Sequence, residues 1–422
     1  MPVLHWPRHK PFGHLRPIRT TIWPPGGAFS FLEPGLTAAL PTVTVGLLFS
    51  TTGAYAALGR EGLAGAQLAI AALNASGTLP FRIQAEHRDP HGITERYAGM
   101  AAEIVALGAR HIVGCTTSWS RKGVIPVLEK HDATLWYPYP YEGFECNEQV
   151  VYLGACPNQH ILPLLQHILP RFGSNGYLVG SNYIWGWETN RIARDIIEQS
   201  GGSVAGERYA PLGDADLGHI LRDIRQKRPD FVLNTLIGPS SYSFLEAYHA
   251  LGKADPDFSM EKRPVVSCNL AEGEAALLGH KAAGLYTIAP YFQALPTSAN
   301  QHFLGQLDAT SQPVSAFFAQ AYSAVQLLVA GLVAAETEDG KSVLASLNQA
   351  TPSTPLGPLQ ILAANNHAVL TPHIARVTAS GALAIIEQRD EPIAPDPYLA
   401  HTSLVVPAAD RVRAGSNLRV VK

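Results

Sequence analysis

The stretch VTVGLLFS, residues 43–50, and the stretch GREGLAGAQLAIAALN, residues 59–74, decide the fold class. The first is a short β-rich run, and the second has helical apolar spacing, so the pair predicts a strand followed by a helix. The alternation continues with strands over residues 81–87 and 111–115 and helices over residues 94–107 and 121–130. This pattern is typical of parallel strands joined by crossover helices.

A second series of the same kind follows residue 152, with strands over residues 177–180, 203–209 and 231–236 and helices over residues 161–172, 185–200 and 216–225. Two such series predict an α/β fold with two doubly wound parallel-sheet lobes that face each other across a cleft. Later strands over residues 284–289, 373–377 and 383–387 indicate that the chain crosses between the lobes more than once.

These patterns predict four parts of the chain. Residues 42–154 with about 287–352 are expected to form lobe I, and residues 155–286 with about 353–400 to form lobe II. Residues 1–41 are expected to be a disordered arm or a misassigned start, and residues 401–422 a C-terminal tail. The uncharged stretch over residues 315–335 is long enough to cross a bilayer, but its polar residues favour a buried core helix, so no membrane span is expected.

Composition excludes several classes of protein. With 31 Lys and Arg against 34 Asp and Glu, the net charge is −3, which is unsuited to direct nucleic-acid binding as the main function. The 46% apolar fraction excludes general disorder. The four cysteines are too widely spaced for a zinc ribbon, so we expect neither a metal site nor a cofactor.

Enzyme motifs are also missing. Ser181 lacks the second glycine of a nucleophile elbow, and Gly340-Lys341-Ser342 is only the tail of a phosphate loop. The histidines form no H-E-x-x-H pair. We therefore predict that the chain is not an enzyme, although a hydrolase assembled from distant residues stays open.

Polar and aromatic residues instead gather after the predicted strands of both lobes. The seven candidate ligand-binding residues are Thr116, Thr117, Ser118, Tyr137, Tyr139, Tyr183 and Trp185. Hydroxyls at a helix start can hold a carbonyl or carboxylate oxygen. Tyrosine supplies a flat apolar wall with a hydrogen-bonding tip. The sequence therefore predicts a small cleft enclosed by aromatic walls.

Several of these segments resemble one branch of a known family. They are GCTTSWSRK at residues 114–122, Tyr137-Pro138, YEGFE at residues 141–145 and ACPNQ at residues 155–159. This set is similar to the urea and short-chain amide receptors among type I periplasmic binding proteins. The likeness is closest to the amide-sensing negative regulators of aliphatic amidase operons, and it covers about residues 42–400.

The resemblance implies a two-lobed clamshell that closes on a small neutral amide. In the family pattern Ser118 bonds the ligand, while Tyr137 and Tyr183 complete the pocket. Thr116 stands where the family has a tyrosine or a tryptophan, Tyr139 replaces a smaller residue, and Trp185 replaces a tyrosine. Because of these departures, acetamide, urea and a larger amide all stay open as ligands.

Two functions follow from the resemblance. The first is a cytoplasmic regulator that sequesters an RNA-binding antiterminator until an amide alters lobe closure. The alternative is the periplasmic substrate-binding component of a urea or amide ABC transporter, with a permease as its partner. Prolines, glycines and Glu33 interrupt the apolar character of the arm, which favours the regulator, whereas Ala38-Ala39-Leu40 would fit a degenerate export signal. The sequence leaves a homo-oligomer open.

Overall fold

The computed structural model of the protein describes residues 40–307, 313–347 and 352–407. The predicted N-terminal arm lies outside this part except for its last two residues, and so does most of the predicted C-terminal tail. From Pro41 onward the described residues belong to one compact unit that contains two large sheets.

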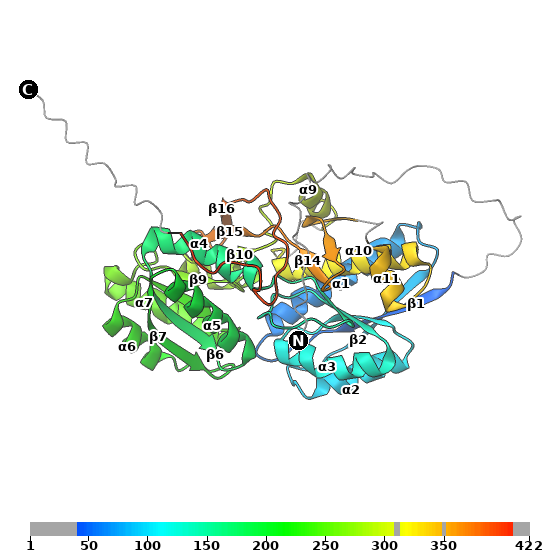
Figure 1. Cartoon of the computed structure of the whole chain (residues 1–422), viewed down its shortest axis with the longest axis horizontal. Coiled ribbons are helices and arrows are strands. Elements are labelled where there is room, and N and C mark those ends of the chain that lie inside the picture. The colour runs from blue at the N-terminus through cyan, green and yellow to red at the C-terminus, as the bar shows by residue number, and fades with distance from the viewer. Residues whose placement is uncertain (1–39, 308–312, 348–351, 408–422) are drawn as a thin grey trace, which may run out of the picture. The chain divides into compact units, whose positions relative to one another are not determined.

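The first sheet is built mainly from the N-terminal third of the chain. Its strands are β1 (Thr42–Leu48), β2 (Arg82–Arg88), β3 (His111–Gly114), β4 (Thr134–Tyr137), β5 (Val150–Tyr152), β13 (Gln360–Leu362) and β14 (His367–Val369). Their order is β13-β14-β5-β4-β3-β1-β2, and all neighbours are parallel except β13, which runs antiparallel to β14. Its early elements are blue and cyan in Figure 1, and β14 is orange.

The second sheet repeats this plan. Its strands are β6 (Asn175–Ser181), β7 (Ser203–Ala210), β8 (Phe231–Thr235), β9 (Val265–Ser267), β10 (Tyr286–Ala289), β15 (His373–Val377) and β16 (Leu383–Glu387). The order is β16-β15-β10-β9-β8-β6-β7, in which β15 is antiparallel to both of its neighbours, β10 and β16, and the other pairs are parallel. Two doubly wound, mainly parallel sheets confirm the predicted fold class.

Helices connect and cover the parallel strands. They are α1 (Ala56–Ala75), α2 (Arg96–Ala106), α3 (Ser118–His131), α4 (Ile161–Phe172), α5 (Ile184–Gln199), α6 (Gly218–Lys227), α7 (Pro239–Ala254), α8 (Glu272–Leu278), α9 (Ser298–Leu304), α10 (Ala316–Ala335) and α11 (Gly340–Ser346). A short antiparallel pair, β11 (Ser353–Thr354) and β12 (Gly357–Pro358), forms a third small sheet, and three 3-10 helices lie at Pro157–Gln159, Pro256–Phe258 and Gly279–Ala282.

Helix α10 is the apolar stretch that the sequence predicted as a core helix. It is long and apolar enough to cross a membrane, but 78% of its most apolar window is buried inside the fold. It packs against α1, where a Cβ atom added to Gly65 would lie 2.2 Å from the Phe318 carbonyl oxygen. Glycine is therefore needed for this close approach, which places α10 in the core beside the first sheet.

The division of the chain between the sheets differs from the prediction at two points. The second segment of lobe I was expected to begin at about residue 287. Strand β10 lies wholly in the second sheet, so the chain leaves that sheet only after Ala289. Residues 353–400 were expected in lobe II, yet β13 and β14 pair with the first sheet. These strands have only three residues each, which is too short for a periodic pattern to assign them.

Candidate functional site

The turn from β3 into α3 is the first part of the candidate site. A Cβ atom on Gly114 would lie 2.3 Å from the Leu48 carbonyl oxygen, and Gly114 has a φ of +145°, so this crossing requires glycine. Thr117 caps the helix: its side chain accepts a hydrogen bond from the Ser120 N–H at 3.2 Å. In return, Ser120 Oγ accepts from the Thr117 N–H at 2.9 Å. The capping box fixes where α3 begins.

Six of the seven residues predicted from the sequence line one small cavity. They are Thr116, Ser118, Tyr137, Tyr139, Tyr183 and Trp185, joined by Leu58, Pro140, Ile237, Asn269 and Phe317. The cavity volume is about 20 Å³, slightly more than the roughly 10–15 Å³ that one water molecule needs. Thr117 is not among the lining residues, because its hydroxyl is used as the helix cap.

The lining residues come from both sheets. Ser118 follows β3 as the first residue of α3, and Tyr137 ends β4, while Tyr183 and Asn269 follow β6 and β9 of the second sheet. Doubly wound sheets bind their ligands at these carboxyl ends. The rings of Trp119 and Tyr183 also meet across the two sides, with centroids 5.2 Å apart. The cavity thus lies between the two sheets, as the sequence predicted for a cleft.

The polar groups of the cavity are uncharged. Tyr139 donates its hydroxyl to the Leu58 carbonyl oxygen at 2.8 Å, and Tyr137 donates to the Thr116 carbonyl oxygen at 3.3 Å. Burial raises the pKa of Tyr137, Tyr139 and Tyr183 well above the ordinary value, so all three stay protonated near neutral pH. Among the described residues, Thr116 Oγ1 and Trp185 Nε1 are buried without a hydrogen-bond partner. Both residues line the cavity.

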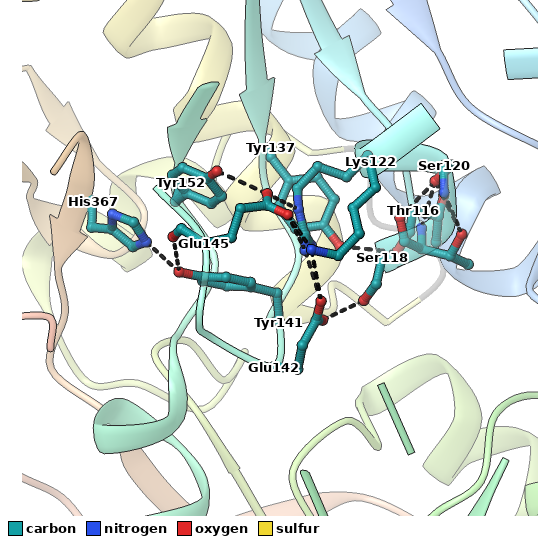
Figure 2. A network of polar contacts seen from close by, with 12 residues as sticks. Thr116, Ser118, Ser120, Lys122, Tyr137, Tyr141, Glu142, Glu145, Tyr152 and His367 are labelled. Atoms are coloured by element: carbon teal, nitrogen blue, oxygen red, sulfur yellow. Dashed lines mark hydrogen bonds and ion pairs between the residues drawn. The ribbon is translucent and has the colours of Figure 1, made fainter. Parts of the chain in front are cut away.

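A buried ion network supports this cavity from the side of α3 (Figure 2). Arg121 is fully buried, and its guanidinium group lies 4.9 Å and 4.7 Å from the ring centres of Tyr137 and Tyr141. It donates to Glu142 Oε1 at 2.9 Å through Nη2 and to Glu145 Oε1 at 2.7 Å through Nε. The two carboxylates hold the cation on one side while the rings cover its faces.

The charges of this network compensate one another. Burial alone would raise the pKa of Glu145, but the neighbouring Arg121 and Lys122 outweigh it and lower that pKa to about 2. Tyr152 donates its hydroxyl to Glu145 Oε1 at 2.8 Å. Glu142 Oε2 accepts the hydroxyl proton of Ser118, which ties the network to the cavity. The sequence had assigned no role to Glu142, although the nearby Arg121-Lys122 pair was a signal for an acid-base network.

A second cavity of about 20 Å³ adjoins the first and shares Pro140, Asn269 and Phe317 with it. His160 and Gln320 also line it, and their atoms Nδ1 and Oε1 are buried without a partner among the described residues. Burial lowers the pKa of His160 to about 4, so this ring is neutral near pH 7. The second cavity therefore extends the site without adding charge.

Three further carboxyl groups lie where α1 meets α8. Glu61 on α1 lies so close to Gly273 that an added Cβ atom there would be 2.0 Å from Glu61 Oε1. Tyr242 donates to Glu274 Oε1 at 3.0 Å, and the Gln293 N–H donates to Glu272 Oε1 at 2.8 Å. Burial raises the pKa of Glu61 to about 7 and those of Glu272 and Glu274 to about 8. We call Glu61, Glu272 and Glu274 the carboxyl cluster. The sequence did not indicate it.

Metal ligands are not grouped in this part of the chain. Within residues 40–307, 313–347 and 352–407, no three His, Cys, Asp or Glu side chains are placed to hold a metal ion. Three of the four cysteines are buried, at positions 115, 156 and 268, and burial raises the pKa of each thiol. Burial and a raised pKa make a thiol a poor nucleophile.

Comparison with known proteins agrees with this architecture. The family profile described as "Periplasmic binding protein domain" matches residues 43–404. A solute-binding protein of an R. palustris ABC transporter in complex with benzoate is 20% identical, with a TM-score of 0.74 over 85% of this chain and 99% of that chain. The branched-chain amino acid transporter substrate-binding protein LivJ from Streptococcus pneumoniae, in complex with isoleucine, is 17% identical. Its TM-score is 0.71, over 82% of this chain and 99% of that chain.

An amino acid ABC transporter substrate-binding protein from Pseudomonas fluorescens is similar to the same degree. It is 20% identical, with a TM-score of 0.72 over 85% of this chain and 98% of that chain. The fold of these proteins therefore extends over nearly the whole described part of the chain.

Proposed function

The chain belongs to the family of periplasmic binding proteins, and from that premise we propose that it binds a small neutral molecule with amide-like polarity, such as acetamide or urea. The observation that carries the proposal is the convergence of six uncharged polar or aromatic side chains from both sheets on one small cavity. A ligand held there would bridge the two sheets and favour their closed arrangement.

The polarity of the lining supports an uncharged ligand. An amide offers one acceptor and two donors without a charge. Thr116 Oγ1 and Trp185 Nε1 can donate to its carbonyl oxygen. A bound carboxylate would require a free cation to offset its desolvation, but Arg121 is paired with two glutamates through Nη2 and Nε and does not line the cavity.

The small volume of the cavity also supports a small ligand. Even acetamide or urea needs more room than about 20 Å³, so the lining must shift to admit either one, and benzoate or isoleucine would require a much larger displacement of the buried rings. We propose that the protein binds its ligand without converting it. None of the residues that line this cavity is a histidine that could act as a base and activate one of its hydroxyls.

A screen by thermal shift tests the ligand class. Acetamide, formamide and urea are expected to raise the melting temperature of the purified full chain, and acetate, benzoate and isoleucine are expected to leave it unchanged. A rise with benzoate or isoleucine, and none with any amide or with urea, would overturn the proposal. Ammonia release from acetamide would contradict binding without turnover.

For the biological role, we propose the substrate-binding component of an ABC transporter, acting outside the cytoplasm with a permease as its partner. This role was the alternative in the sequence analysis, and we place it ahead of the cytoplasmic amide-sensing regulator. The support is that the similar solved structures from R. palustris, S. pneumoniae and P. fluorescens are described as transporter binding proteins.

Cell fractionation of the natural host distinguishes the two roles. Recovery of the chain from the periplasmic fraction, with loss of amide uptake when its gene is deleted, is expected for the transport component. Recovery from the cytoplasm in a complex that acetamide dissociates, with an RNA-binding antiterminator as the second component, would support the regulator and contradict the transport role.

A further inference from the structure

The hydroxyl of Ser118 has only one proton, and the structure fixes where that proton goes. Ser118 donates it to Glu142 Oε2, and both residues are almost completely buried, at 2% and 1% exposed. Glu142 is salt-bridged through its other oxygen to Arg121 Nη2 at 2.9 Å, and Lys122 Nζ lies 3.9 Å from it. A carboxylate can only accept hydrogen bonds, so Ser118 must be the donor.

Because its proton is donated to Glu142, Ser118 Oγ can only accept a hydrogen bond from a ligand in the cavity that it lines. We infer that Glu142, acting through Ser118, makes the site select a ligand that presents an N–H group and reject one that presents a carboxylate oxygen. Glu142 is in this sense a positioning residue for specificity. The inference rests on the proposed function, because it requires that a small molecule occupies this cavity.

The other polar groups fit a ligand bound in one orientation. Trp185 Nε1 can only donate, and it has no partner among the described residues. An amide or urea can therefore present N–H to Ser118 Oγ while its carbonyl oxygen accepts from the free donors of the lining. A carboxylate would bring a second negative charge toward Glu142 and would find a lone pair at Ser118 instead of a proton. That combination is unfavourable in a buried site.

The surroundings of Glu142 hold it in this role. The guanidinium group of Arg121 is confined between the rings of Tyr137 and Tyr141, and Glu145 accepts from its Nε atom. The next residue, Gly143, has a φ of +80°, and an added Cβ atom would lie 2.5 Å from the Pro397 carbonyl oxygen. The loop thus has little room to move, and Figure 2 shows Ser118 and Glu142 side by side with a dashed line between them.

Glu142→Gln tests the inference because the network also determines how the new amide is oriented. Arg121 is a donor, so the glutamine Oε1 atom is expected to face it and the Nε2 atom to face Ser118. Nε2–H would then donate to Ser118 Oγ and free the hydroxyl proton for the ligand. By calorimetry, we expect the ratio of acetamide to acetate affinity to fall by about tenfold or more relative to the wild type.

Glu145→Gln is the matched control. It removes a carboxylate from the same network and is expected to lower stability, but Glu145 makes no hydrogen bond to Ser118 among those of the described residues. The acetamide to acetate ratio should therefore stay within about twofold of the wild type. An equal change of this ratio in both variants would overturn the inference, because it would reflect general loosening of the network.

Ser118→Ala covers the case in which Glu142→Gln does not fold. It removes the acceptor itself, so acetamide affinity should fall more than acetate affinity and the ratio should again decrease. An unchanged ratio in Ser118→Ala, or in a folded Glu142→Gln, overturns the inference while acetamide binding by the wild type leaves the proposed function intact. A wild-type chain that binds neither amides nor urea defeats both.

Discussion

Two groups of buried or partly buried carboxyl side chains in this molecule have opposite electrostatic surroundings. Glu142 and Glu145 face Arg121 and Lys122, and the pKa of Glu145 is lowered to about 2. The carboxyl cluster of Glu61, Glu272 and Glu274 has no comparable cation, and burial raises its pKa values to about 7, 8 and 8. Glu145 therefore stays ionised at every physiological pH, whereas the carboxyl cluster loses protons as the pH rises through neutrality and above.

The comparison explains why the candidate site itself is neutral. In the charged group, Arg121 and Lys122 compensate the two glutamates. This group acts on the cavity only by orienting the hydroxyl proton of Ser118. The carboxyl cluster lies between α1 and α8, outside the lining of the cavity. Charge in the core of this protein therefore affects the stability of the fold, and the proposed ligand would meet hydroxyls and rings.

Replacement of Arg121, the buried cation of the charged group, should have the largest effect on stability. Arg121→Met leaves Glu142 and Glu145 buried without their main partner, which should lower the free energy of unfolding by about 3–5 kcal/mol in urea denaturation. Lys122→Met is the control, since its side chain is 37% exposed and should cost about 1 kcal/mol or less. Similar small losses for both variants would contradict the account.

The carboxyl cluster should reveal itself through the pH dependence of stability. Glu272 has an ordinary pKa of 4.5 and a raised pKa of about 8, so the folded state binds more protons between these values. The free energy of unfolding must then fall as the pH rises through 8. Between pH 6.5 and 8.5, the free energy of unfolding should fall by about 2 kcal/mol less in Glu272→Gln than in the wild type.

Glu246→Gln serves as the control for this experiment. Glu246 is an exposed glutamate paired with Lys281 on the surface, so its replacement should leave the pH dependence unchanged. Denaturation of the three proteins at a series of pH values gives the comparison. Parallel curves for the wild type and Glu272→Gln would show that Glu272 is ionised in the folded state at neutral pH.

A smaller effect separates the two neighbouring threonines of the site. Thr117→Ala removes the cap of α3 and should lower the free energy of unfolding by about 1 kcal/mol. Because Thr117 does not line the cavity, its replacement should change acetamide affinity much less than Ser118→Ala does. Weaker acetamide binding without a lower free energy of unfolding would indicate that Thr117 contacts the ligand, as the sequence predicted.

The sequence predicted the α/β alternation because each strand and helix carries its own hydrophobic period. It could not assign β13 and β14: β13 pairs with β14, and β14 joins the sheet only through β5, more than 200 residues earlier in the chain. His367 of β14 stacks on Tyr152 with ring centres 4.2 Å apart. Contacts of this kind depend on the path of the chain in space, which local patterns do not encode.

For the site, the sequence predicted residues that follow strands, and the carboxyl ends of parallel strands do converge. Thr117 was included because a hydroxyl at a helix start can either cap the helix or bind a ligand, and spacing does not distinguish the two. Glu142 was missed for a different reason. Its effect on specificity depends on the direction of one hydrogen bond, which Arg121 determines across 21 residues of sequence.

Calorimetric titration of the wild type and of Ser118→Ala with acetamide and urea tests the central claim most directly. The account predicts saturable binding of at least one of the two by the wild type, weakened by about 0.5–3 kcal/mol in the variant. Equal affinities in the two proteins would contradict Ser118 as a ligand contact. No binding of either compound by the wild type, together with tight binding of an organic acid, would contradict the neutral site as a whole.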